Sequence, residues 1–238
     1  MPILETVGFT AFDEKRTRGP VGDIALSQPA SGYAVVGGAS KRLFDICAAL
    51  IALIMLAPLF LFTAIAIKLV SPGPVLYGHR RIGHNGRYFK CWKFRSMVTD
   101  GDAVLAKYLA DHPQERDEWV RSRKLRDDPR VTRLGAVLRA YSVDELPQII
   151  NVLMGDMSIV GPRPVVRDEL DIYGSAAAQY LRSRPGITGL WQVSGRSDTS
   201  YEQRIKFDTQ YVQNWSLAAD LWIIMRTIPA VVSSKGSY

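Results

Sequence analysis

The sequence predicts a mainly helical α+β protein of the monotopic membrane class, with a re-entrant membrane helix and a small cytoplasmic domain that contains short strands. Two observations support this prediction. An uncharged apolar run of 22 residues lies near the N-terminus, and as a helix it would reach bilayer scale. The rest of the chain alternates helical and extended patterns, separated by Gly- and Pro-rich turns. We expect a flexible tail over residues 1–38, the membrane helix and its turn over 39–74, and the cytoplasmic domain over 75–238.

Composition narrows the kinds of partner and metal. The formal net charge of +7 points to acidic partners, which include nucleic acid, anionic lipid headgroups and phosphorylated substrates. With two cysteines, Cys47 and Cys91, and three histidines not spaced as ligands on one helix face, neither a disulfide framework nor a zinc site is expected. Any metal should then be a hard ion held by carboxylates and phosphates.

The N-terminal tail mixes acidic and basic side chains where a secretory signal would need a continuous apolar core. Its Gly and Pro content and weak periodicity predict a flexible cytoplasmic segment. Residues 33–36 are the part of it that could pair locally as a strand.

The apolar run covers residues 46–67 and is apolar on all sides, which argues against the alternative of a buried soluble helix. Pro58 near its middle predicts a kink. Basic residues, which prefer the cytoplasm, flank the run on both sides: Lys41, Arg42, Lys68, Arg80, Arg81 and Arg87. We therefore favour a re-entrant helix that dips into one leaflet, and a Pro-kinked spanning helix is the alternative.

The segment after the membrane helix suggests phosphate binding. Residues 75–77 read as a short strand, and GHRRIGHNGR reads as a Gly-rich basic loop suited to phosphate. The pattern that follows, YFKCWKF, alternates ambiguously between strand and other structure. Lys93 and Arg95 are either substrate-binding cations or solvated strand charges.

Two adjacent carboxylates, Asp144 and Glu145, directly precede Pro147 and an apolar helical pattern. Since proline is tolerated in the first turn of a helix, Asp144 is expected at or near the N-cap, where unpaired amides favour anions. An ordinary capping aspartate is the alternative. Upstream, residues 103–125 predict a charged helix pair broken near Pro113, with no evident chemistry.

Downstream, Gly155 predicts a helix stop and residues 157–160 a short strand. Residues 161–164, GPRP, form a rigid turn that presents Arg163, whose planar guanidinium suits diphosphate oxygens, although a structural salt bridge is the alternative. Residues 217–232 predict an amphipathic helix, either at the membrane interface or packed on the core.

Taken in order, the motifs KRLFDICAALIALIMLAPLFL, KFRSM, DDPRVTRLGAVLR, SVDELPQ, MSIVGPRP, PGITGLWQVSGR and YVQNWSLAADL cover nearly everything from Lys41 to the C-terminus. This set resembles the bacterial polyprenyl-phosphate sugar phosphotransferases. The chain looks most like the galactose 1-phosphate transferases that initiate succinoglycan-type exopolysaccharide.

The resemblance implies an inner-membrane enzyme with its catalytic domain on the cytoplasmic face. Such enzymes transfer a sugar 1-phosphate, here with galactose favoured, from a UDP-sugar to undecaprenyl phosphate through a covalent aspartyl phosphosugar, and they release UMP. Asp144 falls on the family's nucleophile and Glu145 on its neighbouring acid, and both are expected to hold Mg²⁺. Lys93 and Arg95 match the basic pair of the KFR motif, and Arg163 matches the phosphate-side arginine of the PRP motif.

The expected partners are a UDP-sugar, undecaprenyl phosphate and membrane lipids. Nucleic acid is not expected, because the chain has no recognised nucleic-acid-binding motif. A membrane-anchored interaction protein would explain the apolar run and the charge, but not the acid pair, the KFR set and the PRP turn together. The sugar, a homodimer, the role of the tail and that of His79, where relatives commonly have Gln, stay open.

Overall fold

The computed structural model describes residues 32–122, 125, 127–195 and 199–232. It is mainly helical with few short strands, as the sequence predicts. The helices are α1 (Gly38–Val70), α2 (Gly101–Asp111), α3 (Pro113–Ser122), α4 (Arg133–Ala140), α5 (Gln148–Met154), α6 (Arg167–Ile172), α7 (Ala177–Leu181), α8 (Leu190–Ser194), α9 (Tyr201–Gln213) and α10 (Leu217–Val232). The strands are β1 (Leu76–Ile82), β2 (Tyr88–Phe94), β3 (Ser158–Val160) and β4 (Gly186–Thr188), and the short 3₁₀ turns are η1 (His84–Gly86), η2 (Val143–Glu145) and η3 (Gly174–Ala176).

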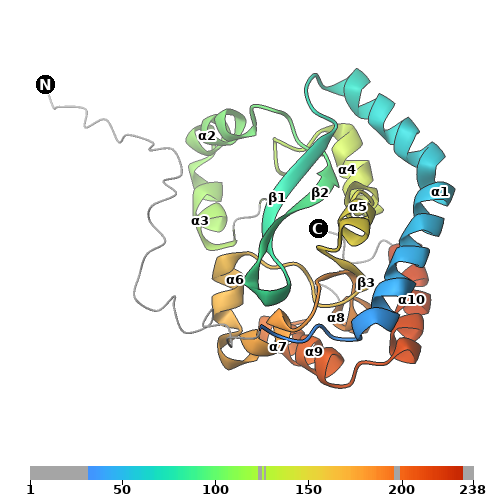
Figure 1. Cartoon of the computed structure of the whole chain (residues 1–238). Helices are drawn as coiled ribbons and strands as arrows, with labels where there is room; N and C mark the ends of the chain where they lie inside the picture. Colours follow the sequence, from blue (N-terminus) through green and yellow to red (C-terminus); the bar gives the residue numbers. More distant parts are fainter. Residues whose placement is uncertain (1–31, 123–124, 126, 196–198, 233–238) are drawn as a thin grey trace, which may run out of the picture.

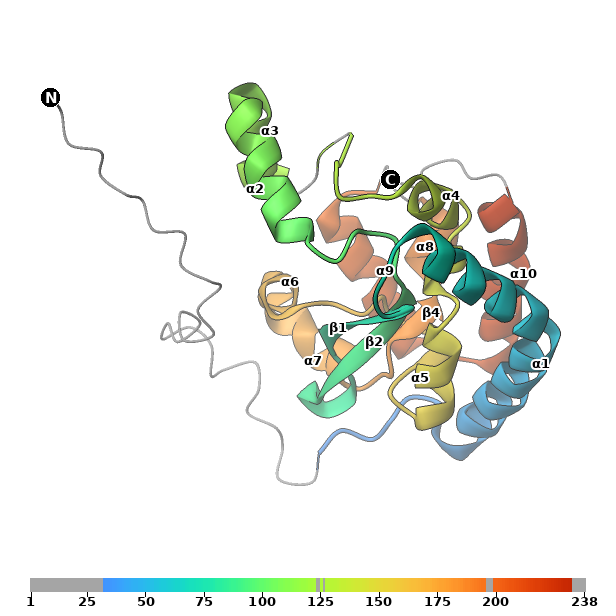
Figure 2. The ribbon, with the colours of Figure 1, turned by 90° about the horizontal axis from the view of Figure 1, so that it is seen from above.

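The apolar run forms α1, a single helix of 33 residues that continues through Pro58 and bends along one side of the domain (Figures 1 and 2). At ~1.5 Å per residue its path is ~50 Å long. One face packs on the domain, where Ala49, Thr63 and Ile67 are buried. The opposite face exposes large apolar side chains: Leu50, Ile51, Ile54, Met55, Leu61, Phe62, Ile65 and Leu69. One face of the helix is therefore buried against the domain and the other is exposed, although the sequence is apolar on both faces.

Polar contacts hold the N-terminal end of α1 to the domain. The Lys41 ammonium donates to the Asp220 carboxylate of α10 over 2.6 Å, and both side chains are buried. Asp45 accepts hydrogen bonds from the Ser158 hydroxyl at 2.9 Å and from a backbone N–H of β3 at 3.0 Å. Arg42 donates to backbone carbonyls at the end of α5. Lys41 and Arg42, which the sequence suggested only as flanking charges, thus bind inside the protein.

The β1–β2 hairpin differs from the predicted short strand and basic loop. Antiparallel pairing runs from Leu76 opposite Phe94 to Ile82 opposite Tyr88, so the first half of GHRRIGHNGR, residues 78–82, belongs to β1. The second half forms the turn, where Asn85 takes a φ of 56°. For residues 78–82 the loop prediction was wrong because glycine and charged residues lower strand propensity locally, whereas cross-strand pairing decides the structure.

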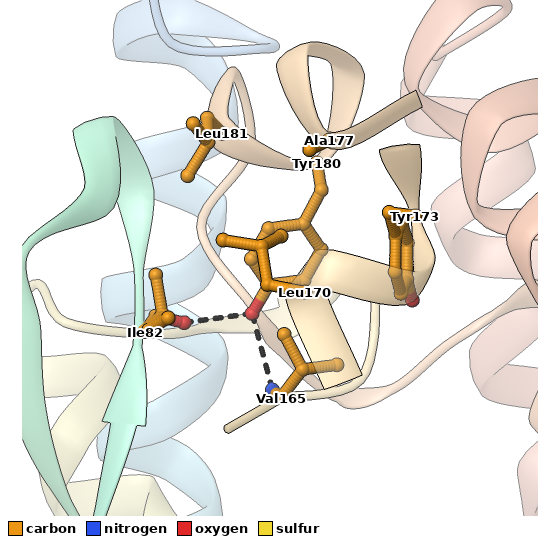
Figure 3. Packing of buried hydrophobic residues seen from close by; sticks show 7 residues of the cluster. All are labelled: Ile82, Val165, Leu170, Tyr173, Ala177, Tyr180 and Leu181. Carbon is orange, nitrogen blue, oxygen red and sulfur yellow. Dashed lines mark hydrogen bonds between the residues drawn. The ribbon is translucent and has the colours of Figure 1, made fainter. Parts of the chain in front are cut away.

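The core beside the hairpin joins it to the segment that follows the PRP turn (Figure 3). The Tyr180 hydroxyl donates to the carbonyl of Ile82 at 2.7 Å and accepts the N–H of Val165 at 3.3 Å. β3 pairs in parallel with β4, with Ser158 opposite Gly186. The chain around residues 161–165 is therefore fixed on both sides.

The remaining predicted elements mostly lie where expected. The charged pair appears as α2 and α3, with the break at Pro113. Residues 33–36 form no strand; instead the Tyr33 N–H donates to the Asn85 side chain. Residues 1–31 of the predicted tail lie outside the described residues. α10 buries Ile223 and exposes Trp222 and Met225, and it lies on the same side of the molecule as α1 in Figures 1 and 2.

Candidate active site

The acid pair lies in η2, a 3₁₀ turn between α4 and α5. Before it, Ser142 has a φ of 55°, a left-handed conformation that non-glycine residues rarely adopt and that concentrates at functional sites. The predicted N-cap position of Asp144 was wrong, because α5 begins at Gln148 with Pro147 as its N-cap. The chain enters α5 through tight i→i+3 bonds, including the Leu146 N–H to the Val143 carbonyl at 3.2 Å.

The two carboxylates have different electrostatic surroundings. Asp144 is 7% exposed, and burial raises its pKa to about 6 although the positive charge of Lys93 opposes the rise. Burial also raises the pKa of Glu145, but Lys93 and Arg163 outweigh it and hold the pKa below its usual value. The Lys93 ammonium donates to a Glu145 oxygen over 2.6 Å. Glu145 is thus a paired anion, whereas Asp144 is the more basic carboxylate.

A shallow hollow, open to solvent, adjoins Glu145. Its lining residues are Arg81, Cys91, Lys93, Glu145, Gln148, Arg163, Pro164, Gly186, Ile187 and Gln192. Three cationic side chains therefore meet at one hollow: Arg81 from β1, Lys93 from β2 and Arg163 from the PRP turn. Such a cluster is suited to a ligand that carries several phosphate oxygens.

The turn that carries Arg163 is held by close backbone packing. The Gly161 N–H donates to the Thr188 carbonyl at 2.9 Å, and the Gly186 N–H donates to the Pro162 carbonyl at 2.8 Å. A side chain at Gly186 would collide with the backbone of Gly161. The Arg163 guanidinium lies 6.0 Å from the ring centre of Trp191, and the rigid turn keeps it beside the hollow.

Arg95 does not join Lys93 and Arg163 at the hollow. Its guanidinium donates to the carbonyl of Ser71 at 2.6 Å and to that of Pro72 at 2.8 Å, at the C-terminal end of α1. Arg95 is 8% exposed, and a side chain at Gly73 would collide with it. Arg95 therefore fixes the C-terminal end of the apolar helix through these hydrogen bonds.

His79 lies near the hollow without lining it. It is opposite Cys91 on the hairpin and shares a face with Arg81 and Lys93. Burial, with the charges of Arg81 and Lys93, lowers the pKa of His79, which makes it a neutral imidazole at pH 7.

Sequence reasoning missed the residue that fixes the strand of Lys93. The Asn151 amide donates to the Lys90 carbonyl at 2.7 Å and accepts the Trp92 N–H at 2.9 Å, and Asn151 is fully buried. It extends the hydrogen bonding of β2 across to α5. Its position inside an apolar helical pattern was the available signal, because a buried amide needs partners.

The acid pair fits a hard divalent cation. Within the described parts of the chain, no cluster of three or more His, Cys, Asp or Glu side chains is placed to hold a metal. Asp144 and Glu145 supply two adjacent carboxylates, and the raised pKa of Asp144 marks negative charge that a cation would stabilise. Mg²⁺ typically binds one or two carboxylates and completes its shell with water and phosphate, which matches this set.

Comparisons with known proteins identify the family. The family model "Bacterial sugar transferase" matches residues 36–234. The exopolysaccharide production protein ExoY of Sinorhizobium fredii is 56% identical over 222 residues, which cover 93% of this chain and 98% of that protein. The undecaprenyl-phosphate galactose phosphotransferase of Salmonella typhimurium is 47% identical over 198 residues, or 83% of this chain and 41% of that protein.

A third relative is named for a different sugar. The UDP-glucose:undecaprenyl-phosphate glucose-1-phosphate transferase of Caulobacter vibrioides is 42% identical over 206 residues, which cover 83% of this chain and 72% of that protein. The family match spans most of the chain and includes the acid pair, the KFR segment and the PRP turn. The chain therefore belongs to the bacterial sugar transferase family and is a transferase of this type.

Proposed function

We propose that this enzyme transfers galactose 1-phosphate from UDP-galactose to undecaprenyl phosphate, as the first membrane step of exopolysaccharide synthesis. The observation that carries the proposal is a buried, relatively basic Asp144 adjacent in sequence to Glu145, which lines a hollow together with three cations; Asp144 itself is not among the lining residues. Relatives whose names state transfer of a sugar phosphate to undecaprenyl phosphate support the substrate class.

In the first step, an Asp144 oxygen attacks the β-phosphorus of the UDP-sugar. A bond forms from that oxygen to phosphorus, the bond from phosphorus to the bridging oxygen breaks, and UMP leaves with the bridging oxygen. Both reactants are anionic, so nearby positive charge must offset their repulsion. Lys93, Arg163 and Arg81 supply it at the hollow.

In the second step, a phosphate oxygen of undecaprenyl phosphate attacks the same phosphorus. The bond to Asp144 breaks, the carboxylate is regenerated, and the product is a polyprenyl diphosphate sugar. Division into two displacements lets one set of cationic groups serve both donor and acceptor phosphates.

Asp144 and Glu145 are the residues that would hold Mg²⁺, which when bound supplies positive charge to phosphate oxygens. Lys93 pairs with Glu145 at 2.6 Å and thereby orients that carboxylate beside Asp144. Arg95 acts indirectly in this scheme, because its contacts fix the end of α1.

The enzyme is monotopic in this proposal, with its domain on the cytoplasmic face of the inner membrane. Lys41 at one end of α1 and Ser71 just beyond the other end both bind the same domain, which supports a helix that enters and leaves the membrane on one side. The exposed apolar faces of α1 and α10 then lie in one leaflet. If a membrane-impermeant thiol reagent labels Ser40→Cys from the periplasm of intact cells, this topology is wrong.

Galactose is the proposed sugar because the relative named for it is more similar to this chain than the one named for glucose. The two hexoses differ only in configuration at C4, so both donors belong in the test. Whether the enzyme forms a homodimer can be tested by measuring the mass of the same purified preparation in detergent.

The decisive experiment incubates purified enzyme with Mg²⁺ and radiolabelled UDP-galactose or UDP-glucose, with and without undecaprenyl phosphate. We expect UMP release and labelled lipid from UDP-galactose, and without acceptor a phosphosugar adduct on intact protein. Asp144→Asn should form neither adduct nor product while it still binds membranes. Transfer by this variant at the wild-type rate, or intersecting double-reciprocal lines without any adduct, would overturn the covalent route.

A further inference from the structure

Asp45, near the start of the apolar run on α1, contacts the strand that leads into the PRP turn. It is 1% exposed, and its Oδ1 accepts hydrogen bonds from the Ser158 hydroxyl at 2.9 Å and from the Ile159 N–H at 3.0 Å. Both donors belong to β3, which lies against this part of α1 in Figure 1. The membrane helix therefore holds β3 directly, through one carboxylate oxygen.

The same helix reaches the end of β3 by a second route. Lys41, one turn before Asp45, donates to Asp220, whose other oxygen lies 2.7 Å from the Tyr211 hydroxyl. That hydroxyl is also 3.0 Å from the carbonyl of Val160, the last residue of β3. Side chains of α1 therefore fix each residue of β3, either directly or through α9 and α10.

Arg163 follows β3 by three positions, and the chain between them has little freedom. The Gly161 N–H donates to the Thr188 carbonyl at 2.9 Å, and a side chain at Gly161 would collide with the backbone at Arg184 and Gly186. Two prolines flank Arg163 and restrict the turn further. Because the surroundings are packed this closely, a displacement of β3 would move Arg163 and would not be absorbed by the turn.

The second carboxylate oxygen of Asp45 argues against a purely stabilising contact. Oδ2 is buried and has no hydrogen-bond partner among the residues that the structure describes. Asp220, in contrast, is contacted by three donors. Since a buried oxygen without a partner lowers stability, the placement of β3 explains Asp45 better than anchoring of the helix does.

We propose that Asp45 is a positioning residue for nucleotide-sugar binding, because it sets the position of β3 and thereby that of the Arg163 guanidinium. Arg163 lines the hollow beside Glu145, whereas Asp45 does not. The inference rests on the proposed function and deepens it: capture of the UDP-sugar diphosphate depends on correct docking of the membrane helix. Asp45 acts through Arg163 and contacts neither substrate.

The test is a calorimetric titration with UDP-galactose and Mg²⁺ in detergent, in an Asp144→Asn background in which binding is not followed by transfer. Asp45→Ala should raise the Kd about tenfold, because Arg163 is displaced from the diphosphate. Asp45→Asn keeps the acceptor oxygen and should stay within about twofold of the background. Ser158→Ala removes one of the two donors and should fall between these variants. The stoichiometry counts folded sites, so partial unfolding does not imitate a change in Kd.

A double variant asks whether the effect passes through Arg163. Arg163→Ala should itself raise the Kd, and Asp45→Ala added to it should raise the Kd no further, because the group that Asp45 positions is already absent. Arg42→Met is the matched control, since it removes hydrogen bonds from the same end of α1 to α5. It should leave the Kd within about twofold of the background, and its effect should add to that of Arg163→Ala.

Three results would each overturn the assignment: an unchanged Kd in Asp45→Ala, additive effects of the Asp45 and Arg163 variants, or binding as weak in Arg42→Met or in Asp45→Asn as in Asp45→Ala. If Asp45→Ala does not fold, Ser158→Ala decides by the same comparison with Arg163→Ala. A background protein that binds neither UDP-galactose nor UDP-glucose would instead contradict the proposed function itself.

Discussion

Two buried carboxylates, one at the anchor of α1 and one at the acid pair, are treated very differently by this fold. Asp220 is fully buried and accepts from Lys41 at 2.6 Å, from the Tyr211 hydroxyl at 2.7 Å and from the Trp215 indole at 3.0 Å. Asp144 is almost as buried, and its pKa rises to about 6. A buried carboxylate with a full set of hydrogen-bond donors stabilises the fold. A buried carboxylate whose charge is not fully offset by donors or cations remains available for reaction.

The largest expected effect is at the anchor. Lys41→Met removes the cation from a buried pair and leaves the Asp220 charge without it, which should lower the free energy of unfolding by about 3–5 kcal/mol. Urea unfolding in detergent measures this. Lys206→Met on the exposed side of α9 is the control and should change stability by less than about 0.5 kcal/mol. A loss at Lys41 as small as that of the control would mean that the anchor adds nothing.

Asp144→Asn should raise the free energy of unfolding, whereas Lys41→Met lowers it. The folded pKa lies about two units above the usual aspartate value, so the ionised form destabilises the fold by about 3 kcal/mol above pH 6, and the penalty disappears below pH 4, where both states are protonated. The variant should therefore be more stable than wild type at pH 8, without divalent cations, and equal to it near pH 3.5. Asp111→Asn, exposed at the end of α2, is the matched control; equal stability of Asp144→Asn and wild type at pH 8 would refute the account.

Tyr211→Phe tests how much of the anchor depends on its hydroxyl. This hydroxyl contacts both the Asp220 carboxylate and the Val160 carbonyl, and a hydrogen bond to a charged group contributes about 1.5–3 kcal/mol. We expect a loss in that range, smaller than that of Lys41→Met. If the two variants lose equal stability, the anchor acts as one cooperative unit in which every contact is needed.

The smallest effect is on rate. In the proposed mechanism an unprotonated Asp144 is the nucleophile, so adduct formation from donor alone should fall about tenfold for each pH unit below about 6, which is ~1.4 kcal/mol per unit. Rapid-quench measurement of UMP release from pH 4.5 to 8 gives the profile. A midpoint near pH 4 would show that the bound substrate or metal removes the effect of burial.

Local sequence patterns predicted the elements that depend on neighbouring residues. The stop at Gly155, the break at Pro113 and the strand before Gly161 all follow from backbone preferences within a few positions. The acid pair stood out because two carboxylates precede an apolar helix. The PRP turn was predictable because its two prolines restrict the backbone conformation.

Contacts between distant residues were not predictable in this way. Arg95 binds carbonyls 23 and 24 positions earlier, and Asn151 binds a strand about 60 positions earlier. Arg81 lines the hollow beside Glu145 only because the hairpin extends further than its propensities suggest. Each role is set by the tertiary fold, which periodicity does not encode.

The ion pair that anchors α1 also constrains how the protein is made. Lys41 and Asp220 are separated by 179 positions, so the helix leaves the ribosome long before its partner exists. At bacterial translation rates of 5–20 residues per second, the interval is roughly 10–40 s. During that time the apolar surface of α1 needs the bilayer or an insertion factor as its host. In the proposed topology, the rest of the domain then folds around a helix that already lies in the membrane, and completion of α10 is the step that joins the two.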